Sequence, residues 1–315
     1  STTTPTSPTT ESPYVDVISC NTVMAAFAQQ GHYEEALQLL SQMKSSQSEP
    51  SQPTDNNVNK SFPWMPLPDT ISYNTCMYAL AKSLSSIQRK NDSNLSFAQQ
   101  QAQHAEDLLR EMMNNNNNND DIQPDTQSYN TVLYAWYQVA AATTTTTTSA
   151  LPASATNTTV AGTFQTPTPS PTRTTTGRQS AAISAAHHAH ELLLIMEDLI
   201  DGGSTLVQPD EYSYSTVIQA YATCQLPYDA QRVLERMIAR CSSTTTYSQD
   251  RTRSSRGSGS DSTRTTRNSN YNNKLAIVRP NRHVYTAVMS AWSKSGQVEK
   301  AQELLDQLLY EYETY

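Results

Sequence analysis

A short octet recurs in this chain and carries the side chains best suited to hydrogen-bonding chemistry. PDTISYNT at Pro68 returns as PDTQSYNT at Pro124 and, with changes, as PDEYSYST at Pro209. The Asn amide after the tyrosine holds a donor and an acceptor side by side and can match the Watson–Crick edge of a base, whereas a Ser or Thr hydroxyl makes a smaller match. The octet therefore indicates hydrogen-bonding sites that repeat along the chain.

Each of these sites opens a helix-like stretch. The five stretches are CNTVMAAF from Cys20, YNTCMYAL from Tyr73, YNTVLYAW from Tyr129, YSTVIQAY from Tyr214 and YTAVMSAW from Tyr285. Val23, Met24 and Phe27 have the spacing i, i+1, i+4, which predicts a helix with one buried stripe. Asn is a poor helix former, yet it stands in the first turn of three stretches and faces away from that stripe.

A second helix pattern follows each first helix. It reads ALQLLSQM from Ala36, AEDLLREM from Ala105, AHELLLIM from Ala189, AQRVLERM from Ala230 and AQELLDQL from Ala301. Gly31 and Gly296 are placed to end the first helix where the two helices are close in sequence. The Asp or Asn after each inter-repeat proline is a favourable N-cap. The unit is therefore a helical hairpin, written five times.

Polar low-complexity segments separate the hairpins. Only 36% of the 315 residues are hydrophobic, and runs of Asn, Thr and Ser cannot bury enough apolar surface to offset chain entropy. We expect a disordered leader at 1–16, disordered insertions at 45–66, 83–96, 114–121, 143–180 and 241–276, and a tail at 311–315. The predicted hairpins are 17–44, 70–113, 126–201, 211–240 and 282–310.

One hairpin with two narrow apolar stripes cannot bury itself, but five stacked hairpins share a continuous core. The predicted fold is therefore an all-α, right-handed solenoid whose concave face is lined by the first helices. Lengthening a turn costs only about 0.6 kcal/mol for each doubling of the loop, so insertions at turns are compatible with this fold.

At these residues the sequence resembles the pentatricopeptide repeat family, because the Y-N-T triplet, the A-x-x-L-L-x-x-M helix and the closing P-D recur in register. Cys20 in place of the tyrosine and the long insertions depart from the family pattern. The resemblance implies sequence-specific binding of single-stranded RNA, one base per hairpin. It also implies a mitochondrial or plastid location.

The resemblance assigns a role to individual residues. Base-reading pairs would be Asn21 with Asp69, Asn74 with Asp125, Asn130 with Asp210 and Ser215 with Asn281. Thr286 would pair with a residue beyond the end of this sequence. In the family an Asn and Asp pair prefers uracil and a Ser and Asn pair adenine, which predicts 5′-U-U-U-A followed by a purine. Base-sandwiching positions would be Ile18, Ile71, Gln127, Tyr212 and His283, and phosphate contacts would come from Lys82 and Lys294.

Other interpretations of these residues stay open. Asp69, Asp125 and Asp210 are also good helix caps. His187, His188 and His190 beside Glu191 invite a metal interpretation, but we expect the start of a partly exposed helix instead and no metal or other cofactor. A net charge of −8 gives no overall attraction to phosphate. The alternative function is a protein-binding helical scaffold without RNA affinity.

Several classes of protein are disfavoured. There is no H-x-E with P-C-x-x-C, no group of catalytic carboxylates and no phosphate-binding glycine loop, so we expect no enzymatic activity and no small-molecule substrate. The four cysteines form no C-x-x-C pair, which argues against a zinc or disulfide framework. No apolar stretch reaches the roughly 18 residues of a membrane span, so we expect a soluble protein.

Overall fold

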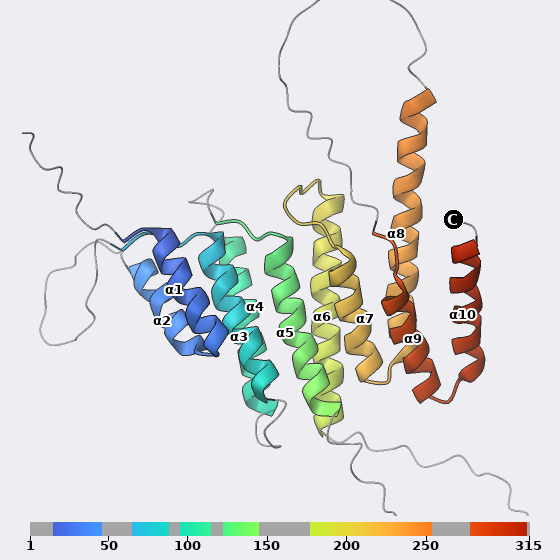
Figure 1. Cartoon of the computed structure of the whole chain (residues 1–315), viewed down its shortest axis with the longest axis horizontal. Coiled ribbons are helices and arrows are strands. Elements are labelled where there is room, and N and C mark those ends of the chain that lie inside the picture. Colours follow the sequence, from blue (N-terminus) through green and yellow to red (C-terminus); the bar gives the residue numbers. More distant parts are fainter. Residues whose placement is uncertain are drawn as a thin grey trace, which may run out of the picture.

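The computed structural model describes residues 15–45, 65–87, 95–114, 122–144, 177–253 and 278–313. These residues form ten helices and no strand (Figure 1). The helices are α1 (Val17–Gln30), α2 (Tyr33–Ser45), α3 (Thr70–Ile87), α4 (Leu95–Asn114), α5 (Thr126–Thr144), α6 (Gly177–Asp201), α7 (Glu211–Thr223), α8 (Pro227–Arg253), α9 (Arg282–Lys294) and α10 (Val298–Glu313).

The helices pair into five hairpins that stack in chain order. Each odd-numbered helix packs on the even-numbered helix that follows it, and α1, α3, α5, α7 and α9 also pack on one another in succession. Figure 1 shows the result as a row of hairpins from α1 to α10. The predicted all-α solenoid is therefore confirmed. In the part of the chain that the structure describes, no helix is both long and apolar enough to cross a bilayer.

The core follows the predicted stripes, with one exception. Cys76, Met77 and Leu80 are completely buried, and the tyrosines that precede the first-helix stripes, such as Tyr129, are buried between hairpins. The apolar stripe of α1 is only partly covered by other helices. Its residue Val23 is 46% exposed. No helix among the described residues packs on that side of α1, whereas α3 and α5 each have a neighbour on both sides.

The helix ends match the predicted punctuation. Asp16, Asp210 and Asn281 are N-caps, and the side chain of each accepts a hydrogen bond from a backbone N–H of the first turn. Gly31 and Gly296 adopt φ values of 82° and 80° at the ends of α1 and α9. Gln225 takes the same left-handed conformation after α7 with φ 59°, which an L side chain adopts only at a cost.

Helical structure extends into all five predicted insertions, by a single residue at Ser45 and at Asn114 and by longer stretches in the other three. α3 continues through Ser83–Ile87, α6 begins before Ser180, and α8 continues from Cys241 to Arg253. The prediction that these stretches are not helical was wrong, because residues of weak helix propensity can continue a helix whose preceding turns are already formed and packed. Most of the predicted leader and of the insertions lies outside the described residues, whereas α10 continues into the predicted tail as far as Glu313.

The histidine cluster was predicted to lie at the start of a helix, but it lies in the middle of α6. His188 stacks on Trp136 of α5 with ring centroids 4.5 Å apart. His187 and His190 both direct Nδ1 at the hydroxyl of Tyr221, at 3.2 and 2.8 Å. The cluster therefore joins α6 to α5 and α7. Burial and the neighbouring Arg236 and Arg232 lower the pKa of His190, against the opposing influence of Glu197 and Asp229.

This lowered pKa makes stability depend on pH. Between the folded and unfolded pKa values the unfolded chain binds more protons at His190, so the free energy of unfolding falls as the pH drops below about 6.5, by at most about 1.4 kcal/mol per pH unit. Above that pH, His190 does not make the free energy of unfolding depend on pH. Urea unfolding at a series of pH values between about pH 5 and pH 8 measures this pH dependence of the free energy of unfolding. His190→Gln should flatten the slope, and the exposed His104→Gln should not. Parallel losses in all three proteins would contradict this assignment.

Candidate nucleic-acid interface

Three predicted base-reading pairs are assembled in the same way. The Asn21 amide nitrogen donates to the Asp69 carboxylate at 3.1 Å, and Asn74 donates to Asp125 at 3.3 Å. Asn130 reaches both oxygens of Asp210 at 3.2 Å. In each pair the Asn comes from the first turn of one hairpin and the Asp from the turn that opens the next. Each site therefore lies between two consecutive first helices.

The three aspartates are also helix caps. Their Oδ1 atoms accept the backbone N–H of the residue three positions on, at 2.8 Å for Ser72 and Ser128 and 2.9 Å for Ser213. Capping and pairing with Asn are therefore not alternatives, since the same carboxylate does both. The cap fixes the position of the carboxylate, and the Asn of the preceding hairpin lies within hydrogen-bonding distance of it.

A serine hydroxyl completes each pair, and the sequence assigned it no role. Ser72, Ser128 and Ser213 are completely buried. Their hydroxyls lie 2.7, 2.7 and 2.6 Å from Oδ1 of the preceding hairpin's Asn. The signal was present in the octet, because this Ser recurs in all three copies. Its function was hidden because its partner is at least 51 residues away along the chain.

Threonines of the same octets form hydrogen bonds with the loops that precede the aspartates. The Thr70 hydroxyl accepts from the backbone N–H of Gln123 at 3.2 Å, two residues before Asp125. Thr126 does the same for Gln208 at 2.8 Å, two residues before Asp210. An octet at one hairpin thus helps to place the Asp of the next.

The fourth predicted pair is not assembled. The Ser215 hydroxyl donates to the carbonyl of Tyr212 at 3.1 Å, within its own helix. The Asn281 amide donates to the Glu211 carboxylate instead, while its oxygen caps α9. Val284 stands where the other boundaries have the buried serine, so no hydroxyl is present there. The structure therefore separates three similar sites from a different fourth one.

The predicted base-sandwiching positions are all exposed. Ile18, Ile71 and Tyr212 keep 70%, 60% and 48% of their exposure, and Gln127 and His283 are exposed as well. Large apolar side chains on a surface are suited to stacking against a flat partner. Each of these residues lies three positions before a reading position, so the exposed side chain and the amide come from the same helical turn.

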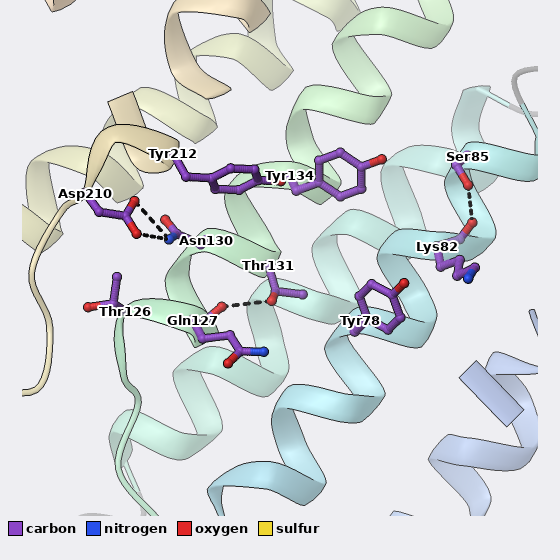
Figure 2. A pocket seen from close by; sticks show the side chains of 10 residues that line it. All are labelled: Tyr78, Lys82, Ser85, Thr126, Gln127, Asn130, Thr131, Tyr134, Asp210 and Tyr212. Carbon is purple, nitrogen blue, oxygen red and sulfur yellow. Dashed lines mark hydrogen bonds between the residues drawn. The ribbon is translucent and has the colours of Figure 1, made fainter. Parts of the chain in front are cut away.

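A groove of about 730 Å³ connects several of these residues (Figure 2). Its walls include Asn130 and Asp210, the exposed Gln127 and Tyr212, and Lys82. Residues predicted for base reading, base sandwiching and phosphate contact thus line one groove across α3, α5 and α7. Figure 2 shows the Tyr212 ring beside the Tyr134 ring.

Two tyrosines in this groove were not predicted. Tyr78 and Tyr134 follow Asn74 and Asn130 by one helical turn and line the groove. The Lys82 ammonium lies 5.6 Å from the centroid of the Tyr78 ring. The equivalent residues in the other first helices are Ala25, Gln219 and Ser290, so no repeated pattern marked these tyrosines.

The predicted residues of the last hairpin lie apart from this groove. Thr286, His283 and Lys294 are exposed on α9 and do not line it. The Thr286 hydroxyl donates to the carbonyl of Arg282 at 2.6 Å. Among the described residues no group of three or more His, Cys, Asp or Glu side chains is placed to hold a metal ion.

Comparison with known proteins gives the same repeat assignment for parts of the chain. Models of the pentatricopeptide repeat match residues 15–58, 212–241 and 283–311. No curated protein matches the sequence.

Among solved structures, the pentatricopeptide repeat protein PPR10 from maize matches with 14% identity and a TM-score of 0.47, over 94% of this chain and 24% of that one. A structure of PPR10 in complex with an 18-nt psaJ RNA element matches with 13% identity and a TM-score of 0.24, over 96% of this chain and 36% of that one. This chain therefore spans about a third or less of those proteins. The matched stretches lie on stacked helical hairpins, and the chain therefore contains pentatricopeptide repeats.

Proposed function

We propose that this protein binds single-stranded RNA along its first helices, one base at each hairpin boundary. The observation that carries the proposal is the threefold Asn and Asp pair, held in the same geometry at three consecutive boundaries. A structural cap needs only the Asp. The Asn adds an amide NH₂ group beside a carboxylate, and this combination of donor and acceptor suits the edge of a base.

The three assembled pairs predict three consecutive uracils. Uracil presents N3–H as a donor beside O4 as an acceptor, and the pair offers a carboxylate oxygen and an amide N–H in return. Asn21 and Asn130 are half-buried, whereas Asn74 keeps 8% of its exposure. We extend the predicted target to 5′-U-U-U-A-purine by placing adenine at Ser215 and Asn281 and a purine at Thr286.

Exposed neighbours would hold the bases in place. Ile18 and Ile71 offer apolar surface to the faces of bases, and Tyr212 offers an aromatic ring for stacking, which is worth about 1–3 kcal/mol per base. Lys82 at the edge of the groove supplies a positive charge for phosphate. Because the net charge is −8, we attribute most of the affinity to base contacts rather than to general attraction.

Fluorescence anisotropy with short labelled RNAs tests this function. The full chain should bind U-U-U-A-A at least about tenfold more tightly than C-C-C-C-C, since each matched base contributes roughly 1–3 kcal/mol of discrimination. Equal binding that weakens steeply with salt would show non-specific attraction. No binding would favour a protein-binding scaffold, and magnesium-dependent cleavage of the RNA would indicate an enzyme.

Such a protein would act by occupying its site on a transcript. Binding would mask the RNA from nucleases or from pairing with itself, or would deliver a partner protein. We assign the activity to organellar RNA metabolism on the family resemblance alone.

A further inference from the structure

We propose that Ser72, Ser128 and Ser213 set the polarity of the neighbouring Asn amides, and that this polarity decides between uracil and cytosine. The inference rests on the proposed function and adds a third residue to each reading pair. These serines are positioning residues, because each is completely buried and acts through the Asn of the preceding hairpin.

The polarity follows from the hydrogen bonds of the hydroxyl. A hydroxyl has a single proton to donate. The Ser128 hydroxyl accepts the backbone N–H of Asp125 at 3.1 Å. Its proton is directed at Asn74 Oδ1, 2.7 Å away, and more distantly at Asp125 Oδ1, 2.9 Å away. The side-chain oxygen of Asn74 must therefore face the serine, and its nitrogen must face the aspartate.

The other two sites have the same arrangement. Ser72 accepts from Asp69 N at 3.2 Å, and Ser213 accepts from Asp210 N at 3.1 Å. Both then donate to the Asn of the preceding hairpin. Turning the amide over would bring its oxygen against the carboxylate and replace a hydrogen bond by repulsion between two acceptors, while the serine hydroxyl would lose its acceptor on the Asn.

The orientation of the amide matters because uracil and cytosine have opposite patterns of hydrogen-bond donors and acceptors at positions 3 and 4. Uracil presents a donor at N3 and an acceptor at O4, whereas cytosine presents an acceptor at N3 and a donor at N4. A half-turn of the amide would place its oxygen against the acceptor O4 of uracil, or opposite the donor N4 of cytosine, and would therefore weaken the preference for uracil over cytosine. A serine that holds the amide in one orientation therefore holds one preference.

The fourth boundary is the natural example of a site without this serine. The Val284 side chain cannot donate a hydrogen bond, and there the Asn281 amide donates to Glu211 rather than contacting Ser215. The buried hydroxyl thus accompanies every assembled pair and is missing at the predicted pair that is not assembled.

The test compares single-base preferences in full-length Ser128→Ala and wild type. Ser128 acts on Asn74, the middle of the three assembled sites, so RNAs with U or C at the second position of U-U-U-A-A report on it. We expect Ser128→Ala to reduce the preference for U over C at this position about fivefold, the equivalent of one hydrogen bond. The preference at the third position, read by Asn130, should not change.

Two further variants separate positioning from loss of structure. Ser128→Thr keeps the hydroxyl and should restore the preference, and Ser213→Ala should move the effect to the third position. An equal loss of affinity for both bases, or the same change at every position, would show that the serine supports only the fold and would overturn the inference. If wild type shows no preference for U over C at any position, the proposed function itself fails.

Discussion

Replacing Asn74 and Asn130 together by alanine should lower the affinity for U-U-U-A-A about 100-fold. Each substitution removes the amide of one assembled pair, at an expected cost of roughly 1–2 kcal/mol, or about tenfold. Affinity for C-rich RNA should change little, so the preference for uracil should be largely lost. Anisotropy titrations at fixed salt measure both affinities.

The fold should survive this double substitution. Alanine is a better helix former than asparagine, and Asp125 and Asp210 keep their bonds to the backbone of α5 and α7. Asn114→Ala, at the exposed end of α4, is the matched control and should bind as wild type does. If the double variant and this control bind U-rich RNA equally, the amides do not read bases.

Glu197→Ala should have the largest effect on stability. This carboxylate is 1% exposed and receives the Tyr214 hydroxyl at 2.7 Å. Arg236 and Arg240 lie 2.6 and 3.3 Å from its oxygens. Arg236 and Arg240 keep 49% and 31% of their side-chain exposure, so water can solvate them when the carboxylate is removed. The buried Tyr214 hydroxyl loses its acceptor, at a cost of about 1–3 kcal/mol.

Thermal unfolding followed by circular dichroism measures this effect. For about 200 ordered residues the melting temperature should fall by roughly 5 °C. Glu197→Gln keeps an acceptor for Tyr214 but loses the charge, so its loss should be smaller. Glu303→Ala, exposed on α10, should stay within about 0.5 kcal/mol of wild type. A Glu197→Ala protein as stable as this control would show that solvent reaches the carboxylate.

The repeat itself was readable from the sequence because its determinants are local. The apolar stripe, the capping Asp and the helix-ending Gly act within one or two turns of helix, so Met77, Asp210 and Gly31 could each be assigned from their neighbours. The solenoid follows from the same information, since a hairpin with two stripes must stack. The helix limits at Ile87 and Arg253 were missed because packing decides how far a weakly helical segment continues.

Contacts across hairpins were decided only by the tertiary structure. Asn21 pairs with Asp69 over a separation of 48 residues and Asn130 pairs with Asp210 over 80, yet the donor to acceptor distances are 3.1 and 3.2 Å. Stacking of the first helices, not distance along the chain, sets this geometry. The same cause explains why the role of Ser128 was invisible in its own octet.

The sequence alone therefore determined which residues repeat and which helix each belongs to. It did not determine that Glu211 would capture Asn281, that Val23 would remain exposed, or that Tyr78 and Tyr134 would share a groove with Tyr212. Helix periodicity is a short-range property of the chain, whereas these contacts depend on which neighbour each hairpin meets.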